Sequence, residues 1–367
     1  MKAAGSRSAV LDRRTFLRMA GAAWVATLGA GPAFALSRTD AVFASGYMDR
    51  DGTFGIAVLS DDGTVIDRTA LPARSHGMAF SPVTNHLVAF ARRPGTFALV
   101  IDRSGKSEPV TIAATEDRHF FGHGCFSPDG KLLYASENDF DANRGVIGLY
   151  AARDTYRRIG EYQTYGIGTH DLSVSDDGSL LIAANGGIET HPDFGRTKLN
   201  LDHMEPSLAL IDAATGTLVE RHTLPQKLRQ LSTRHIDLDN KGRIWFACQY
   251  EGPRNDLPPL VGHFGKGEDL TFLSLPEETT IGLANYVGAI AVNRRENHVG
   301  LTSPNGGRFV VLDADSGRVL SEKAVPDAAG IAAAPHGFAV SSYDGLFVGR
   351  REALVWDQHI AGLTSHR

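Results

Sequence analysis

The segment GHGCFSPDG (122–130) decides the fold, because it recurs along the chain in recognisable form. Related segments are SHGMAFSP (75–82), THDLSVSDDG (169–178) and RHIDLDNKG (234–242). Each copy has a histidine at or near the start of a short apolar run, and in most copies a turn rich in Asp, Gly or Pro follows. Two weaker copies, VGAIAV (287–292) and GIAA (330–333), have no histidine. A unit of this kind therefore organises most of the chain.

Each unit reads as four short strands. A second apolar strand follows the turn, as at 131–136 and 179–184, and two more strands complete the unit. Repeats of this length, each with four strands, are typical of β-propeller blades. Six units lie inside the chain, residues 41–71 add three strands, and the tail around His359 adds a fourth. We therefore predict an all-β, seven-bladed β-propeller with four antiparallel strands per blade, in a ring closed by strands from both termini.

The first 35 residues have the pattern of an export signal. The segment DRRTFL (12–17) precedes an apolar run at 19–31, and Ala33-Phe34-Ala35 resembles a cleavage site. Paired arginines before a weakly hydrophobic run predict a twin-arginine signal peptide at 1–35. An ordinary secretory signal with a chance arginine pair is the alternative. The run is shorter than the roughly 20 residues that span a bilayer, so no membrane span is expected after signal removal.

This signal predicts a periplasmic protein that the twin-arginine translocase exports. The mature chain, 36–367, is predicted to be a single domain. The whole chain carries a formal net charge of −5, which becomes −9 without the first 35 residues, and this argues against nucleic acid as a partner. Two cysteines, Cys125 and Cys248, are too few for a disulfide framework and are expected as buried free thiols. No CxxCH motif is present, which excludes covalent c-type haem.

Polar residues collect where the first strand of a unit begins and where its second strand ends. In a propeller these positions converge on one mouth of the central channel. The third unit also carries an insertion, residues 186–206, which we interpret as a lid over this mouth because long loops in compact domains are usually functional. The predicted ligand-binding residues are Glu137, Asn138, Asp171, Asn185, Arg196, Lys198, Arg234, Gln249 and Tyr286.

The repeated histidines suggest a metal site. Imidazole is a common ligand of iron, copper and zinc, and the candidate ligands are His123, His170 and His235, with His191 from the lid. The alternative is that a histidine repeating with the blade belongs to the blade architecture. Starts of first strands on opposite sides of a ring are also far apart, so at most two or three of these histidines are expected to share an ion.

Two other kinds of site stay open. Cationic residues on the same face (Arg92, Arg93, Arg196, Lys198 and Arg234) suggest anion or carbohydrate binding, unless they pair with neighbouring carboxylates. Hydrolysis has weaker support, because the Gly-x-Ser-x-Gly and HExxH motifs are absent. Lactonase-type chemistry would use acidic metal ligands, whereas histidine dominates here.

With these residues assembled, the chain resembles a family of twin-arginine-exported bacterial proteins of unknown function. The segments that carry the resemblance are 122–124 with 137–138, 168–171, 185–192, 195–196, 198–200, 204, 206–208, 234–235, 249 and 285–288. The resemblance implies a YVTN-like, quinoprotein-amine-dehydrogenase-like propeller. It also implies a genomic neighbourhood with imelysin-type proteins and a dihaem-peroxidase-like protein, and hence a link to iron uptake.

Together these observations predict a periplasmic binding protein or accessory factor for iron or other metal acquisition. It would use the histidine-rich channel mouth under the 186–206 lid, with periplasmic iron-uptake proteins or a small ligand as partners. The alternative is a metal-dependent oxidoreductase or a lactonase-type hydrolase at the same site. A scaffold that binds only other proteins is a third hypothesis.

Overall fold

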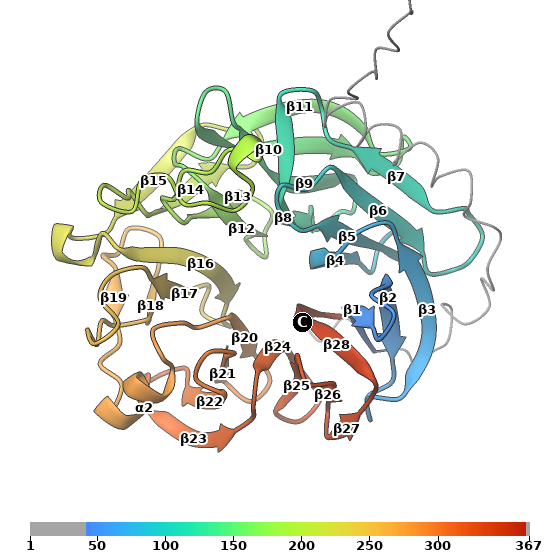
Figure 1. The fold of residues 1–367 in the computed structure, drawn as a ribbon. Helices are drawn as coiled ribbons and strands as arrows, with labels where there is room; N and C mark the ends of the chain where they lie inside the picture. The colour runs from blue at the N-terminus through green and yellow to red at the C-terminus, as the bar shows by residue number, and fades with distance from the viewer. Residues whose placement is uncertain (1–41, 365–367) are drawn as a thin grey trace, which may run out of the picture.

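A computed structural model describes residues 42–364, which form seven four-stranded antiparallel sheets arranged in a ring (Figure 1). The prediction of a seven-bladed β-propeller with four antiparallel strands per blade is confirmed. The predicted signal peptide, 1–35, lies outside the described residues.

The first four blades follow the chain in order. Blade I consists of β4 (Ser75–Ser81), β5 (His86–Ala91), β6 (Phe97–Asp102) and β7 (Val110–Ala113). Blade II consists of β8 (Arg118–Phe126), β9 (Leu132–Asp139), β10 (Arg144–Ala151) and β11 (Arg157–Gln163). Blade III consists of β12 (Thr169–Val174), β13 (Leu180–Asn185), β14 (Ser207–Asp212) and β15 (Leu218–Thr223). Blade IV consists of β16 (Leu231–Leu238), β17 (Ile244–Tyr250), β18 (Val261–Phe264) and β19 (Thr271–Phe272).

The last three blades complete the ring. Blade V consists of β20 (Ala289–Asn293), β21 (His298–Ser303), β22 (Arg308–Asp313) and β23 (Val319–Ala324). Blade VI consists of β24 (Ala328–Ala333), β25 (Phe338–Ser342), β26 (Leu346–Phe347) and β27 (Arg350–Arg351). Blade VII joins β28 (Leu354–Gly362) to β1 (Phe43–Asp49), β2 (Phe54–Leu59) and β3 (Val65–Leu71).

Blade VII closes the ring with strands from both ends of the chain, as predicted. The innermost strand β28 pairs antiparallel with β1, and Phe43 lies opposite Gly362. Pairing the last strand with the first removes the open edge that an unclosed ring would expose.

Helical structure is sparse in the part of the chain that the structure describes. It is limited to α2 (Glu277–Gly282) and the 3-10 turns η1 (Pro192–Phe194) and η2 (Gln226–Leu228). Among residues 42–364, no helix is long and apolar enough to cross a membrane.

The core lies between neighbouring sheets. The largest apolar cluster joins blades III, IV and V around Trp245 and Phe246, both fully buried. Cys248 belongs to this cluster, and burial raises the pKa of its thiol. Cys248 and Cys125 are both free thiols, as predicted, but only Cys248 is buried; Cys125 is half-buried.

The recurring turns fix how each innermost strand returns. In blade II the Asp129 carboxylate accepts hydrogen bonds from the Ser127 hydroxyl and the Lys131 amide, at 2.7 and 3.0 Å. Gly130 adopts a φ of +66°, which a residue without a side chain adopts readily. The same arrangement recurs at 175–179 in blade III. These local contacts explain why the repeat is visible in the sequence.

Candidate metal centre

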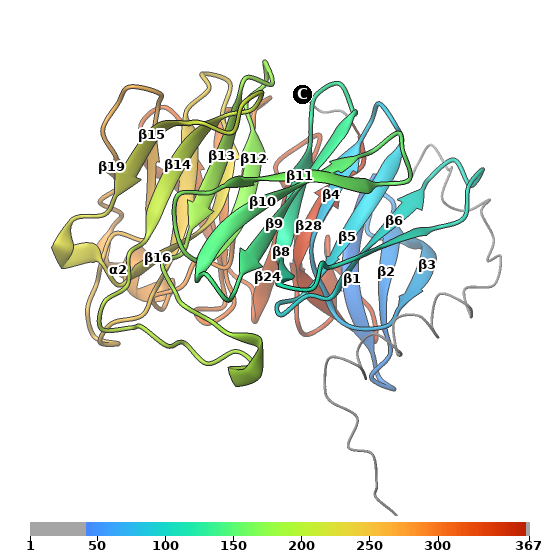
Figure 2. The same cartoon turned by 90° about the horizontal axis from the view of Figure 1, so that it is seen from above.

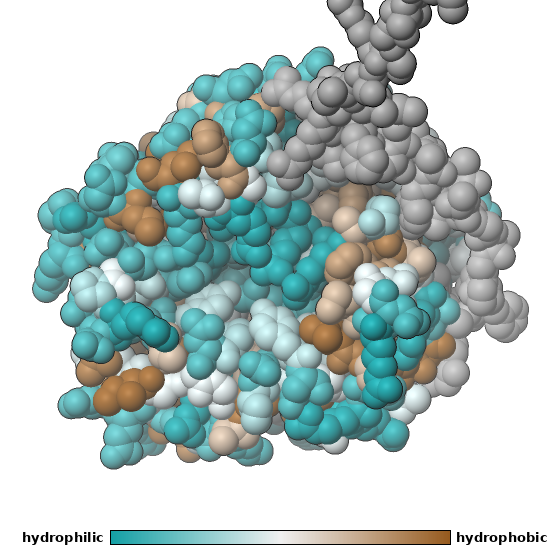
Figure 3. Space-filling model, in the orientation of Figure 1, coloured by the Kyte–Doolittle hydropathy of each residue, from teal (hydrophilic) through white to brown (hydrophobic). Residues whose placement is uncertain are grey.

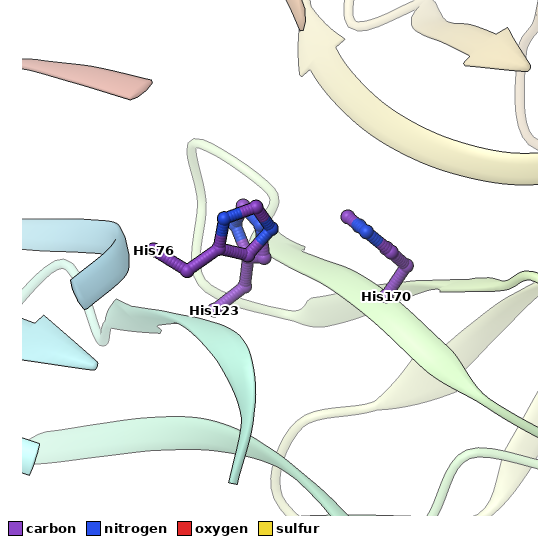
Figure 4. Close-up of side chains that lie close together, drawn as sticks. All are labelled: His76, His123 and His170. Carbon is purple, nitrogen blue, oxygen red and sulfur yellow. The ribbon is translucent and has the colours of Figure 1, made fainter. Parts of the chain in front are cut away.

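Irregularities in the innermost strands bring five histidines into the channel. The pairing registers of β4, β8, β12 and β16 with their neighbours shift at His76, at 121–123, at His170 and at Arg234. The pairing of β28 with β1 shifts across 357–359. A β-bulge re-aims the side chains beside it. Figure 4 shows His76, His123 and His170, which come from three neighbouring blades and lie close together.

The five histidine rings form one contiguous cluster, which we call the histidine cluster: His76, His123, His170, His235 and His359. They come from five consecutive blades, VII and I to IV. The ring centroids of His123 and His359 are 4.6 Å apart, as are those of His235 and His359. The centroids of His170 and His235 are also 4.6 Å apart. Such spacing places several ring nitrogens around a common space.

Two groups of three histidines are compact enough to hold an ion. His123, His235 and His359 each offer one nitrogen, and these three atoms lie within 4.8 Å of one another. His76, His123 and His170 form a second such group, which shares His123 with the first. Each group is therefore of the size that could hold one ion.

Several nitrogens of the cluster are buried and have no hydrogen-bond partner among the described residues. They include Nε2 of His123, His235 and His359. They also include Nδ1 of His76 and His170. Buried polar atoms are normally paired, since leaving one unpaired costs about 1–3 kcal/mol. His123, His235 and His359 thus each have a buried, unpaired Nε2 atom.

Asp171 holds two members of that group. Its carboxylate lies 3.3 Å from Nδ1 of His123 and 3.7 Å from Nδ1 of His235. It also accepts hydrogen bonds from the Leu172 and Ile236 amides, at 2.9 and 3.2 Å. Burial would raise the pKa of Asp171, but the two histidines lower it below its ordinary value. A carboxylate on the distal nitrogen is the usual support of a metal-binding histidine, because it fixes the tautomer that leaves Nε2 free.

Burial keeps most of the cluster neutral near pH 7. It lowers the pKa of His76, His170 and His359 well below the ordinary value of 6.5. It lowers the pKa of His235 to about 4. Neighbouring histidines act in the same direction. Metal binding requires the neutral imidazole, so these rings are in the binding form at neutral pH.

A cationic cavity of about 390 Å³ opens onto the histidine cluster. Its wall is made by the following residues: His76, Arg92, Arg93, Phe121, His170, Arg196, Lys198, Arg234, Gln249, Tyr286, Pro304, Asn305, Tyr343 and Gln358. Figure 3 shows the centre of the ring as a hollow bordered mainly by hydrophilic residues. Because His76 and His170 line the cavity, the cavity and the histidine cluster are continuous.

The long connection between β13 and β14 contributes to this wall and projects beyond one face of the ring (Figure 2). Its loop is held by Asn200, which accepts from the Glu189 amide at 2.8 Å and donates to the Gly187 carbonyl at 3.0 Å. Ile188 and Met204, within the loop, are buried. Arg196 and Lys198 of this loop belong to the cavity wall.

The cavity holds more positive than negative charge. Among the described carboxylates, Glu251 pairs with both Lys198 and Arg234. Arg93 lies over the Phe121 ring, and burial, together with neighbouring arginines, lowers its pKa to about 9. The pairing of charges expected as an alternative thus covers only two of the five cations.

Other residues singled out from the sequence lie away from the cavity wall. Glu137 is buried within blade II, where it accepts from the Tyr150 hydroxyl at 2.5 Å and pairs with Arg158 at 2.9 Å. Asn138 donates to the Thr190 carbonyl at 3.5 Å. Asn185 bonds to Thr164, Thr169 and Ser207. These residues tie strands and loops together.

His191 also lies apart from the cluster. It packs against Phe140 and Phe194 and accepts a hydrogen bond from the Asp193 amide at 3.2 Å. It belongs to neither group of three histidines. Sequence reasoning did not include His76 and His359 among the metal ligands. The repeat itself signals His76, and the segment HIAG (359–362) resembles the start of the RHIDLD copy.

Comparison with known proteins identifies the family. A model described as "Protein of unknown function (DUF1513)" matches residues 69–363, and the chain belongs to this family. No curated protein matches the chain.

Solved structures with a similar fold include hydrazine synthase of Kuenenia stuttgartiensis, with a TM-score of 0.60 and 17% identity over 81% of this chain and 91% of that chain. They also include the β-propeller domain of Cps50 (Swd1) from Myceliophteria thermophila, with a TM-score of 0.59 and 11% identity over 87% of this chain and 97% of that chain. At these identities the similarity concerns the fold alone.

Proposed function

We propose that this member of the DUF1513 family binds a transition-metal ion through Nε2 of His123, His235 and His359. One observation carries the proposal. These three nitrogens are buried and have no partner among the described residues, and the three histidines bring one ring nitrogen each within 4.8 Å of one another. Three imidazoles suit zinc, copper or iron, whereas magnesium and calcium prefer oxygen ligands. Three protein ligands also leave room for a ligand from outside the protein.

We further propose that the protein acts in the periplasm as a binding protein or accessory factor for iron or other metal acquisition. Its export by the twin-arginine translocase rests on the sequence of residues 12–35. The link to imelysin-type partners rests on the family resemblance. The histidine cluster supports the metal-binding part of this function, because two groups of three of its rings are compact enough to hold an ion and two of its members, His76 and His170, line an accessible cavity.

A second function uses the same residues. A metal-dependent oxidoreductase or lactonase-type hydrolase would need space for a substrate beside the metal, and a cavity of about 390 Å³ opens onto the cluster. Pockets for small organic molecules have about this size. The metal would be a resident cofactor in this case and a cargo in the first.

The test is elemental analysis of the mature protein, purified from the periplasm without a histidine tag. We expect close to one equivalent of iron, copper or zinc, or uptake of one equivalent when the metal-free protein is loaded. His359→Ala should abolish this binding, because it removes one of three ligands. The matched control is His263→Ala, since His263 also has a buried unpaired nitrogen but packs against Trp245, away from the cluster.

Two results would overturn the proposal. One is the absence of bound metal after loading with each ion. The other is equal metal content in the His359→Ala variant and the wild type. Retention of the folded state by both variants, measured by circular dichroism, distinguishes loss of a ligand from loss of the fold. Turnover of a metal-loaded protein on a screened substrate would favour the enzyme over the binding protein.

A further inference from the structure

We propose that the cationic cavity binds a small organic anion with two or more carboxylate groups, directly above the histidine cluster. The proposal deepens the proposed function, because it names the class of ligand that enters the same site. It starts from the excess of positive charge in the wall and is tested separately from metal binding.

The charge in the wall is unbalanced. Five cationic side chains line the cavity: Arg92, Arg93, Arg196, Lys198 and Arg234. Glu251 is paired with two of them, and neither Arg92 nor Arg196 forms an ion pair with any carboxylate among residues 42–364. Arg234 is 6% exposed, and its Nε has no hydrogen-bond partner in that range. Gathering like charges in a partly buried space is unfavourable unless an anion compensates them.

The cations are distributed around the mouth. Arg92 follows the second strand of blade I, Arg196 belongs to the loop of blade III, and Arg234 belongs to the first strand of blade IV. They are near enough to influence one another, because the charges of Arg92 and Arg234 lower the pKa of Arg196. Burial is the larger cause of that shift. Guanidinium groups on separate elements match an anion whose charges are spread over several groups.

The remaining wall is suited to an organic ligand. Gln249, Asn305 and Tyr286 offer neutral hydrogen-bonding groups, and Phe121 offers an aromatic face. The volume of about 390 Å³ exceeds what a single inorganic oxyanion needs. A hydroxyl-bearing di- or tricarboxylate would use both kinds of wall, charged and neutral.

The floor connects this ligand to the metal centre. His76 and His170 line the cavity, and both belong to the second group of histidines that could hold an ion. His123 belongs to both groups and packs against His76 and His170, so a carboxylate seated above these two rings would lie next to a ligand of the proposed metal. Polycarboxylates bind transition metals through oxygen, so the geometry is suited to a metal that arrives as a polycarboxylate chelate.

The test is isothermal titration calorimetry on the metal-free protein with citrate, inorganic phosphate and glycerol. We expect one citrate per chain, weaker binding of phosphate and no binding of glycerol. Arg92→Gln and Arg196→Gln should each weaken citrate binding at least about tenfold, because each removes a charge-assisted hydrogen bond. The matched control is Arg157→Gln, which removes one charge from an exposed surface pair with Asp154 and should change the affinity less than twofold.

Other outcomes would contradict either the polycarboxylate site or the proposed metal site. No citrate binding to the metal-free protein would overturn the polycarboxylate site, whether or not the protein binds a metal. Phosphate binding as tight as citrate binding would show a site for a single oxyanion group and would also overturn it. Equal losses in the Arg157→Gln and Arg196→Gln variants would show a nonspecific effect of charge. Citrate binding by a protein that takes up no metal would leave this inference standing and overturn the proposed function.

Discussion

Replacing Asp171 with asparagine should weaken metal binding without removing a ligand. The Asp171 carboxylate contacts Nδ1 of both His123 and His235, at 3.3 and 3.7 Å. An asparagine has the same shape, but one of its two polar atoms is an NH₂ group that donates hydrogen bonds. The variant can therefore support one imidazole and not both in the tautomer that leaves Nε2 free.

The expected magnitude follows from the number of supports lost. Loss of one hydrogen bond that orients a ligand typically lowers metal affinity 10- to 100-fold, which corresponds to about 1.4–2.7 kcal/mol. Since one of two supports is lost, we expect the zinc dissociation constant of D171N to rise by about this factor. The assay is competition for zinc between the metal-free protein and a chromophoric chelator of known affinity.

Asp237 provides the matched control. It lies half-buried in blade IV two residues beyond His235, and its carboxylate accepts hydrogen bonds from the Leu238 and Val292 amides at 2.8 and 2.7 Å. Burial raises the pKa of Asp237 to about 6. It pairs with no histidine among the described residues, so D237N should change the zinc dissociation constant less than threefold.

Two results would refute this reasoning. If D171N binds zinc as tightly as the wild type while His359→Ala does not bind it, Asp171 has no part in orienting the ligands. If D171N and D237N weaken binding equally, the effect comes from general loss of negative charge in the channel. Unfolding temperatures of the metal-free variants, measured in parallel, show whether either substitution destabilises the fold.

Three further predictions concern the fold around the site. Gly122→Ala should lower the free energy of unfolding in urea by about 1–3 kcal/mol and weaken metal binding, because φ at residue 122 is +108° and the added Cβ would lie 2.7 Å from the His76 ring. Unchanged stability would show that residue 122 does not require this backbone conformation. Glu161→Gln should cost about 1 kcal/mol at pH 7, since hydrogen bonds from Arg118 and Arg158 lower the pKa of Glu161 from 4.5 to about 2. This stabilisation is complete above pH 4.5 and is lost as the pH falls towards 2, so unfolding curves of variant and wild type should converge there. Deleting β28 should prevent folding, because it removes the inner strand of blade VII. The measurement is the thermal unfolding curve, which should lose its cooperative transition. A cooperative transition in the deletion variant would show that the ring does not need this closure.

The blade count was predictable from the sequence because the repeat is local. The Asp-Gly turn and the strands on either side lie within about 20 residues of one another, and their hydrogen bonds are made within the same segment. Blade VII was predictable from incomplete units at each end of the chain. The ring needed a partner for three unpaired strands at 41–71, and the C-terminal tail was the available one.

The ligand set was less predictable, for two physical reasons. The signature that marks the other histidines is a strand, a turn and a second strand, but β28 has no turn after it. Its partner β1 lies about 300 residues earlier, so His359 appears in the sequence without its context. The bulges also decide which side chain enters the channel, and their size differs from blade to blade.

The polar residues at the ends of second strands were harder to place. Glu137 was expected at the mouth, where the second strand was predicted to end at residue 136. The structure extends β9 to Asp139, so Glu137 lies inside the sheet, and its carboxylate binds Tyr150 and Arg158. A shift of three residues in the end of a strand moves a side chain from the mouth into the core. In contrast, Arg234 and Gln249 line the cavity.

The remaining question from the sequence is whether the histidines serve the blade or a ligand. A structural role would give each histidine a hydrogen bond within its own blade. Instead, the side chains of His123 and His235 reach Asp171 on a neighbouring blade, and one nitrogen of each ring in the cluster is unpaired among the described residues. Blades V and VI also form four-stranded sheets, with Gly288 and Gly330 near the corresponding positions.

A blade therefore forms with or without this histidine, and the cluster is confined to five consecutive blades. Burying five imidazoles with unpaired nitrogens is unfavourable for the fold by itself, because each unpaired atom costs about 1–3 kcal/mol. An ion held by His123, His235 and His359 would replace three of these missing hydrogen bonds with coordination bonds. The cationic wall of the cavity is also unfavourable by itself, because its clustered positive charges lack a compensating anion. A metal below and a polycarboxylate above would satisfy both parts of the site at once, which is why we regard them as halves of one binding event.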